Sequence, residues 1–548
     1  MYAAEEMGLA LRNAAYSPNI KERMDHSCTL FDAERRLVAQ AEHIPVHLGS
    51  MALALDRGLA AYGDALHEGD QLIFNDPYLS GTHLPDVTLV APVFFRGEPV
   101  GYVANKAHHS DVGGRAPGSL AATATSLYEE GLILPPLRLL QRHRLNAGVL
   151  KLVLQNVRAP SVTQGDLRAQ IAANRLGIAR FQALYERYGR RRIKEAITEI
   201  LNHSERKLRA AISRMPRGRF AAVDFLESTG VAEELVRLRV TIHVQDEALR
   251  FDYRGTALQV PGPVNAAYGV TLAGVYFVLK ALVDPELSMN EGCFRPVTVD
   301  VPEGTLLNPR RPAPVGAGNV ETSQRNVDVL LKALAQIWPE RVCAGSQGTM
   351  NNLAMGGIDP VKGGSWAYYE THGGGYGARP GLDGENGVHS HMTNTLNTPI
   401  EVLEHAIPVR VHRYSLRPNS GGPGQWRGGL GIEKQIELLA AEATVTLLGE
   451  RCVIAPWGVF GGKPGARGAY SLVDRTGHRR RLPSKCTLSV RQGEMLVLRT
   501  PGGGGYGDPG ARMRKSVEED MLDGYVSATH ARRQYSVRAS EGQAARSG

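Results

Sequence analysis

Two apolar runs around a short turn constrain the fold of this chain more than any other feature. The first run, residues 87–95, is rich in Val, Leu and Phe, and residues 100–107 return after Arg96-Gly97-Glu98-Pro99. Such runs on either side of a Gly/Pro turn predict a β-hairpin. Pro92 inside the first run predicts an edge position or a bulge, because proline cannot donate to a ladder.

The hairpin is expected to bring two polar segments together at its open end. A register centred near residues 97–98 predicts that Asp86 lies roughly opposite His109 and Val87 opposite His108. Directly opposed residues of an antiparallel pair lie about 5 Å apart. The side chains expected to gather at this end of the sheet are those of His83, Asp86, His108, His109 and Asp111.

A mixed set of imidazoles and carboxylates is typical of a metal site. Neutral imidazole suits Zn, Fe, Ni and Cu, and carboxylate suits Mg, Ca and Mn. A His/Asp set without Cys therefore points to Zn, Mn or Fe(II). The alternative is that these residues serve their loops, with Asp76 and Asp86 in turns and His83 and His109 as ordinary surface histidines.

Three residues nearer the N-terminus are weaker candidates for the same site. Asp25 stands before a strand-like segment, residues 28–31, where it either caps the strand or adds a carboxylate ligand. His43 and His47 lie in a loop that leads into an expected helix over residues 51–62. They belong either to the site or to a network of loop hydrogen bonds.

The pattern of the whole chain predicts a multidomain α+β protein with mixed sheets. A metal-site domain with a helical segment is expected over residues 1–215, and an α/β domain over residues 216–342. Much of the 62 glycines falls after residue 370. Because glycine permits tight turns, residues 343–548 are expected to form a strand-rich domain with long loops.

Charge and cysteine content exclude several classes of protein. The net charge is +8, but the basic stretches are interpreted as solvated faces, so nucleic-acid binding is not expected. No signal peptide is visible, and the most apolar window, residues 270–283, is too short to cross a bilayer. We therefore expect a cytoplasmic protein without membrane contact. The five scattered cysteines, without a C-x-x-C motif, fit that compartment: they are Cys28, Cys293, Cys343, Cys452 and Cys486.

Four residues in the second half of the chain are candidates for substrate binding. Arg325 precedes an expected helix and can meet an anionic substrate. His372 lies in a Gly-rich polar cluster, and His389 and His391 alternate on a possible strand, which places both imidazoles on one face. A network of loop hydrogen bonds explains these residues equally well. The chain contains no P-loop, no G-x-S-x-G and no H-E-x-x-H motif.

Several long strings point to one family of enzymes. They include NDPYLSGTHLPDVTLVAPVF, KAHHSDVGGRAPGS, NVETSQRNVDVLLKAL, YYETHGGGYGARPGLDGENGVHSHMTNTLNTPIEVLE, LRPNSGGPGQWRGGLGI and TPGGGGYGDP. Through them the chain resembles, nearly end to end, the hydantoinase B / 5-oxoprolinase B-type (N-methylhydantoinase B) family. That family also contains the alpha subunits of acetone and acetophenone carboxylases. Its members usually begin a few residues earlier, so a longer N-terminus is expected.

The resemblance implies a metal-dependent subunit of a two-subunit enzyme. It assigns the divalent metal, Mn, Zn or Fe, to Asp25, His83, Asp86 and His108. It also implies a separate A-type subunit that binds ATP and phosphorylates the substrate, so a hetero-oligomer is expected. The reaction would then be ATP-dependent hydrolysis of a cyclic amide such as 5-oxoproline or a hydantoin.

The neighbours of the implied ligands supply candidates for proton transfer. His109 and Asp111 are expected either to relay a proton to or from the reacting group, or to support the ligands or bind a second metal ion. The alternative function is that of an alpha-type subunit of a ketone carboxylase, which would share the ligand set. A regulatory subunit with a vestigial site is a third reading, against which the intact Asp/His set argues.

Overall fold

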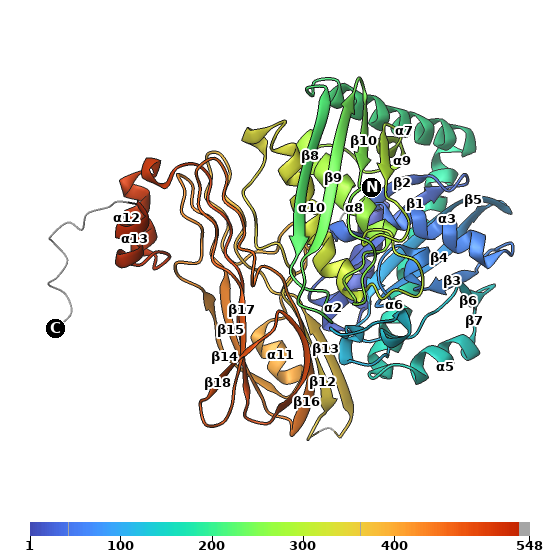
Figure 1. Cartoon of the computed structure of the whole chain (residues 1–548). Coiled ribbons are helices and arrows are strands. Elements are labelled where there is room, and N and C mark those ends of the chain that lie inside the picture. Colours follow the sequence, from blue (N-terminus) through green and yellow to red (C-terminus); the bar gives the residue numbers. More distant parts are fainter. Residues whose placement is uncertain (42, 362, 536–548) are drawn as a thin grey trace.

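The computed structural model describes residues 1–41, 43–361 and 363–535 and confirms a multidomain α+β fold. Its described strands form four sheets, which Figure 1 shows with the first sheet at the right and the C-terminal strands at the lower left. No described helix has both the length and the apolar character needed to cross a membrane.

The first sheet carries the segments on which the sequence argument rests. It has seven strands, in the spatial order β2 (Leu37–Ala41), β1 (His26–Asp32), β5 (Glu98–His108), β4 (Asp86–Phe95), β3 (Gln71–Phe74), β6 (Leu137–Gln141) and β7 (Arg144–Leu145). The helices of this part are α1 (Tyr2–Ala14), α2 (Pro18–Lys21), α3 (Ser50–Tyr62), α4 (Pro77–Ser80), α5 (Ala147–Gln155), α6 (Pro160–Tyr188) and α7 (Arg190–Ile212).

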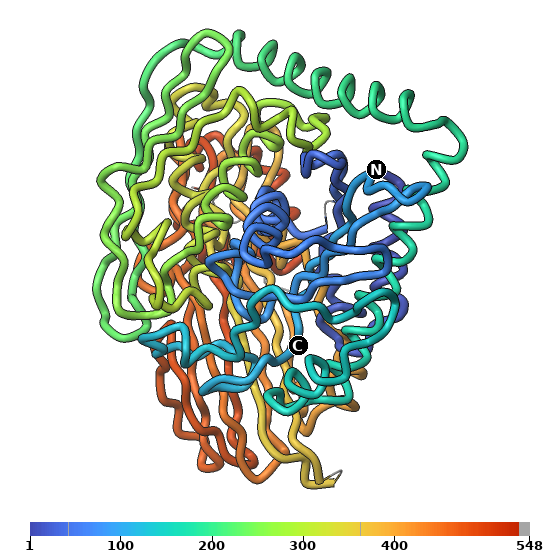
Figure 2. Tube along the Cα trace, turned by 90° about the vertical axis from the view of Figure 1, so that its right-hand side faces the viewer, coloured from blue at the N-terminus to red at the C-terminus, as the bar shows by residue number. Residues whose placement is uncertain are grey.

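The two faces of the central strands differ in character. Side chains such as Leu30 and Val103 pack with Met7 of α1 and Phe181 of α6, and form an apolar core. The opposite face carries a second apolar cluster around Phe31 and becomes polar toward the open end of the hairpin, where Lys106 is buried. Because side chains alternate along a strand, His108 and Asp86 share this face with Lys106 at the ends of β5 and β4. The long helix α7 follows these elements and lies along the outside of the molecule (Figure 2).

The hairpin forms as predicted, but its register differs by one residue. Arg96 and Gly97 make a two-residue turn with φ of 53° and 81°, as a type I′ turn requires. Val93 pairs with Gly101 and Phe94 with Pro99, so the intervening residue of β5 forms a bulge. The turn is centred one residue earlier than expected, which alone would pair Asp86 with Ala107, and the bulge moves the partner on to His108, whereas the pattern alone predicts His109.

The middle of the chain forms a four-stranded sheet with helices against it. The strand order is β11 (Val297–Asp300), β10 (Ala248–Asp252), β9 (Val236–Gln245) and β8 (Gly218–Leu226). Helix α10 packs on β8 and β9 and on the almost entirely apolar helix α8. The helices here are α8 (Tyr268–Val278), α9 (Glu291–Phe294) and α10 (Ser323–Leu334).

The C-terminal part contains two sheets that share one core. Leu353 and Val445 of one sheet belong to the same apolar cluster as Ile436 and Leu496 of the other. The first sheet is ordered β13 (Ser365–Glu370), β12 (Asn352–Ile358), β16 (Glu442–Leu448) and β19 (Lys485–Arg491). The second is ordered β14 (Val409–Leu416), β15 (Ile432–Leu438), β20 (Met495–Arg499), β17 (Ala469–Val473) and β18 (Arg479–Leu482). The helices are α11 (Ile400–Ala406), α12 (Arg514–Leu522) and α13 (Ala528–Tyr535).

Between the C-terminal sheets and α12, long glycine-rich segments run side by side (Figure 1). Their main chains are hydrogen-bonded to one another, as where Gly503 N–H donates to the carbonyl of Gly429. A Cβ added to Gly503 would lie 2.0 Å from the carbonyl oxygen of Tyr376. Only glycine permits backbones to approach this closely.

The domain boundaries placed at residues 215 and 342 stay a prediction. Each sheet is built from strands of only one predicted domain. One apolar cluster, however, joins all three parts, since it contains Ile44, Leu238 and Leu448.

Candidate metal centre

Three buried side chains meet at the open end of the β4–β5 hairpin. His83 Nε2 lies 3.3 Å from Asp86 Oδ1, and His108 Nδ1 lies 3.2 Å from the same oxygen. The two ring nitrogens, His83 Nε2 and His108 Nδ1, are 3.2 Å apart. Within the described residues, this is the group of three or more His, Cys, Asp or Glu whose ligand atoms lie close enough to share one metal ion.

The local fold fixes this arrangement. Asp86 begins β4 and His108 ends β5, and the two are paired across the ladder. Gly81, with φ of 79°, ends α4 and turns the chain toward His83. The Asp86 N–H then donates to the His83 carbonyl at 3.1 Å, which closes a tight turn between the two ligands.

The donor atoms fit a divalent ion. His83 Nδ1 donates to the Gly316 carbonyl at 3.1 Å, so its Nε2 presents a lone pair to the cluster. Neither carboxylate oxygen of Asp86 has a well-formed hydrogen bond, although both are buried. Atoms bonded to one ion at about 2.1 Å with tetrahedral angles lie about 3.4 Å apart, close to the separations found here.

Charge and burial oppose each other in this cluster. Burial acts to raise the pKa of Asp86, but its interactions with His83, His108 and His47 have the larger effect. They hold the pKa of Asp86 well below its usual value. Burial acts to lower the pKa of His83, but the negative charge of Asp86 outweighs this effect and raises the pKa above its usual value. At His108 burial dominates and lowers the pKa. The cluster therefore keeps a carboxylate anion in the protein interior, which suits the binding of a cation.

A small cavity adjoins the cluster. Its volume is about 20 Å³, close to the room that one water molecule needs. Its walls include Asp25, His47, Asp86 and His108, together with Tyr369 and Thr371. The predicted ligand Asp25 thus faces the same space, although it lies outside the close group of three.

Of the two histidines whose role the sequence left undecided, His47 lines this cavity. Its Nε2 is 3.5 Å from Asp86 Oδ2, and its Nδ1 is 2.9 Å from the Ser27 hydroxyl. His43 instead lies beside His26, with ring centroids 4.8 Å apart. Tyr369 was not found from the sequence. Its ring stacks on His108 with centroids 4.7 Å apart, yet nothing in its local sequence signals that contact.

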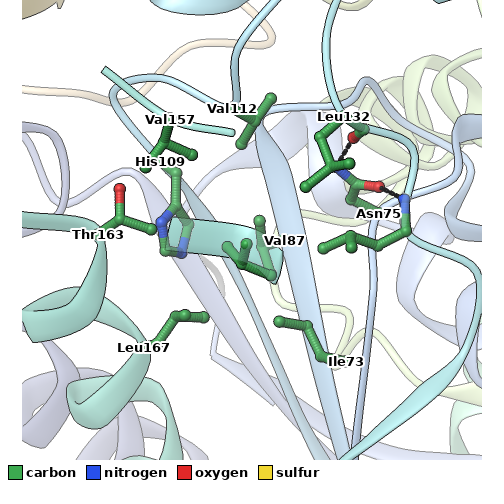
Figure 3. A pocket seen from close by; sticks show the side chains of 11 residues that line it. Ile73, Asn75, Val87, His109, Val112, Leu132, Val157, Thr163 and Leu167 are labelled. Atoms are coloured by element: carbon green, nitrogen blue, oxygen red, sulfur yellow. Dashed lines mark hydrogen bonds between the residues drawn. The ribbon is translucent and has the colours of Figure 1, made fainter. Parts of the chain in front are cut away.

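The two residues expected to relay protons lie elsewhere. His109 Nε2 is 2.9 Å from Gln170 Oε1 of α6, and the ring faces an apolar cavity of about 10 Å³ lined by Val87 and Leu167 (Figure 3). Alternation explains this, since His109 follows His108 and points to the opposite face. Asp111 accepts hydrogen bonds from loop amides and from Arg158 Nη1 at 2.8 Å.

The four expected substrate-binding residues are not gathered at the cluster. Arg325 is fully buried and pairs with Asp328 at 2.9 Å. His391 Nε2 lies 3.3 Å from Asp328 Oδ1. His372 Nε2 lies 3.2 Å from Glu370. His389 is held neutral, because burial lowers its pKa to about 3. Their roles in substrate binding stay predictions.

Comparison with known proteins places this geometry in a family. The hydantoinase B/oxoprolinase family model matches residues 1–509. An uncharacterized protein of Methanocaldococcus jannaschii is 47% identical over 98% of this chain and 94% of its own length. The B component of a putative D-/L-hydantoinase of Pseudomonas is 34% identical over 97% of this chain and 92% of its own. The 5-oxoprolinase 1 of Arabidopsis thaliana is 38% identical over 92% of this chain, which spans only 41% of that protein.

Two solved structures share the fold. The ATP-dependent caprolactamase of Pseudomonas jessenii superposes with a TM-score of 0.92 and 31% identity, over 98% of this chain and 95% of that one. An acetone carboxylase structure also gives a TM-score of 0.92, over 99% of this chain and 79% of that one, and at 20% identity it shows the shared fold alone. The chain belongs to the hydantoinase B/oxoprolinase family.

Proposed function

We propose that this chain is the metal-dependent B-type subunit of an ATP-dependent cyclic amidase of the 5-oxoprolinase and hydantoinase class. The observation that carries the proposal is the buried His83–Asp86–His108 cluster beside a cavity for about one water molecule. The names of the oxoprolinase, hydantoinase and caprolactamase relatives support the reaction class. The bond broken is then the C–N bond of a cyclic amide.

The metal would be held by His83, Asp86 and His108, with Asp25 as the fourth ligand from the cavity wall. The mixed His/Asp donor set suits Mn, Zn or Fe(II). A divalent ion bound there supplies Lewis acidity and lowers the pKa of a coordinated water to about 7.

His47 is the group of this chain best placed to handle a proton. When Nδ1–H donates to the Ser27 hydroxyl, Nε2 presents its lone pair beside the cavity. Nε2 can then take a proton from the attacking water, and the imidazolium so formed can pass that proton to the amide nitrogen as it leaves. We assign this role to His47 in place of His109 and Asp111, because the contacts of those two residues direct them away from the cluster.

ATP would act on a partner subunit. An amide carbonyl is a poor electrophile, and phosphorylation of its oxygen makes the carbon easier to attack. The name of the Pseudomonas relative, the B component of a hydantoinase, supports a division of labour with an A-type, ATP-binding subunit. We therefore propose a cytoplasmic hetero-oligomer, in keeping with five unpaired cysteines.

A ring substrate needs more room than the cavity offers. Pockets for small molecules usually hold about 300 Å³ or more, whereas this one holds about 20 Å³. Part of its wall is formed by Met392, Thr393 and Thr395. Substrate binding therefore requires the cavity to widen, and the substrate delivered by the partner is expected to trigger this change.

The test combines metal analysis with activity of the reconstituted pair. The purified chain, alone and with its A-type partner, is analysed for metal by mass spectrometry and incubated with ATP and 5-oxoproline, a hydantoin or caprolactam. Near-stoichiometric metal and ATP-dependent ring opening are expected, and both should disappear in His83→Ala with His108→Ala. His109→Phe is the matched control and should keep both.

Two results would overturn the proposal. An unchanged metal content in the double variant would show that His83 and His108 are not the metal ligands. Fixation of labelled bicarbonate into a ketone, without ring opening of any cyclic amide, would replace the amidase with the ketone carboxylase alternative.

A further inference from the structure

Glu130 is a buried carboxylate that the proposed reaction leaves without a role. It follows the short 3₁₀ helix Leu127–Glu129 and has 2% of its surface exposed. Its Oε1 accepts from the Gly316 N–H at 2.8 Å, and its Oε2 accepts from the Val315 N–H at 3.0 Å. Burial raises the pKa of this carboxyl to about 7, and the two amides act in the opposite direction.

The residue that Glu130 holds is also the one that holds His83. Gly316 donates its N–H to Glu130, and its carbonyl accepts from His83 Nδ1 at 3.1 Å. Gly316 begins the helical segment that leads into α10, so the direction of its carbonyl is tied to the position of its N–H. A Cβ at this position would lie 2.9 Å from Glu130 Oε1, so the close approach depends on glycine.

The rest of the loop before Gly316 is anchored independently. The Tyr78 hydroxyl donates to the Ala313 carbonyl at 2.8 Å, and the Leu127 N–H donates to the Pro312 carbonyl at 2.9 Å. Arg311 forms an ion pair with Asp76. These contacts hold residues 311–313, whereas the two residues beside His83 are held by Glu130.

We infer that Glu130 is a positioning residue of the metal centre, acting on His83 through Gly316. By fixing Gly316 it fixes the carbonyl that keeps the proton of His83 on Nδ1 and directs Nε2 at the cluster. Histidine ligands usually depend on such a partner for the other ring nitrogen, and its loss typically lowers metal affinity about 10- to 100-fold. The inference rests on the metal centre proposed above.

The experiment measures metal affinity separately from stability. Wild type, Glu130→Gln and Tyr78→Phe are freed of metal and titrated with Zn²⁺ or Mn²⁺ against a chromophoric chelator. The Co²⁺ form of each is examined by visible absorption, which reports the ligand set. Glutamine cannot accept from both amides in the manner of a carboxylate, so Glu130→Gln should bind metal about 10- to 100-fold more weakly and change the Co²⁺ spectrum.

Tyr78→Phe is the matched control, because it removes an anchor of the same loop without touching Gly316. It should bind metal with an affinity within about threefold of wild type, whatever its effect on the melting temperature of the metal-free protein. Equal affinities of Glu130→Gln and wild type would refute the role of Glu130. So would an equal loss in Tyr78→Phe, which would assign the effect to loop stability.

The outcomes also separate this inference from the proposal beneath it. A wild type that binds no metal overturns both the metal centre and the role of Glu130. A wild type that binds metal, together with an unaffected Glu130→Gln, overturns only the role of Glu130. If Glu130→Gln does not fold, Gly316→Ala disturbs the same contact from the other side and should weaken metal binding to a similar extent.

Discussion

Lys106 offers a quantitative test of how the polar face of the first sheet is built. Its side chain is fully buried, and its Nζ donates to Ser80 O at 2.8 Å and to Ser50 Oγ and Thr82 Oγ1, each at 3.2 Å. All three acceptors are uncharged. Burial therefore dominates and lowers the pKa of Lys106 from 10.5 to about 8, although the Asp86 charge acts in the opposite direction.

The sign and size of the effect follow from linkage. Between the two pKa values the unfolded chain binds the proton more tightly than the folded chain, so stability rises with pH over this range. Below the folded pKa of about 8 the full difference of 2.5 pKa units applies, which corresponds to about 3 kcal/mol of lost stability. As pH rises through 10.5, this penalty disappears.

The perturbation is Lys106→Met, compared with wild type by urea unfolding of the metal-free proteins at pH 7 and at pH 10. Methionine removes the titration, so wild type should gain about 2 to 3 kcal/mol relative to the variant between these pH values. The loss of the Lys106 hydrogen bonds also destabilises the variant, and the change in these bonds on deprotonation is already contained in the pKa shift. A difference that does not change with pH would refute the reasoning and would mean that Lys106 keeps its ordinary pKa.

Three further variants probe separate parts of the molecule. His47→Gln should keep its metal, measured by mass spectrometry, while kcat of the reconstituted pair falls about 10²- to 10⁴-fold; an unchanged kcat would exclude the proton role. Glu370→Gln removes the buried ion-pair partner of Lys434, which lies at 2.6 Å, and should lower the free energy of unfolding in urea by about 3 to 5 kcal/mol. A decrease below about 1 kcal/mol would show that this ion pair does not stabilise the fold. His109→Phe leaves Gln170 Oε1 without its hydrogen-bond partner and should lower the free energy of unfolding by about 1 to 3 kcal/mol, with the metal retained. Loss of the metal would mean that His109 contributes to the metal site.

The local part of the site was predictable from sequence. The hairpin follows from two apolar runs and a turn, and it brings His83, Asp86 and His108 together as expected. What the pattern could not supply was the bulge, since one extra residue leaves the composition of a strand unchanged. That residue decides that His108, not Ala107, lies opposite Asp86, and the turn, one residue earlier than expected, excludes His109.

The remaining parts of the site depend on packing between distant segments. Tyr369 reaches His108 from β13, and Gly316 reaches His83 from the loop before α10. Neither contact can be predicted from the local sequence, because each depends on how segments far apart in the chain pack against one another. Arg325 illustrates the opposite case: its charge suggested a substrate, but it is fully buried and paired with Asp328 and Glu450.

The glycine-rich segments have a consequence for any survey of mutations in this protein. Gly375, like Gly503, approaches a carbonyl so closely that an added methyl group would lie 2.0 Å from it, in this case from Gly429 O. Replacement by alanine should therefore be rejected there as strongly as replacement of a metal ligand. A map of intolerant positions would show two unrelated clusters, and only the one at His83, Asp86 and His108 would report on chemistry. The other would report on a stretch of chain in which the backbone itself is the packing surface.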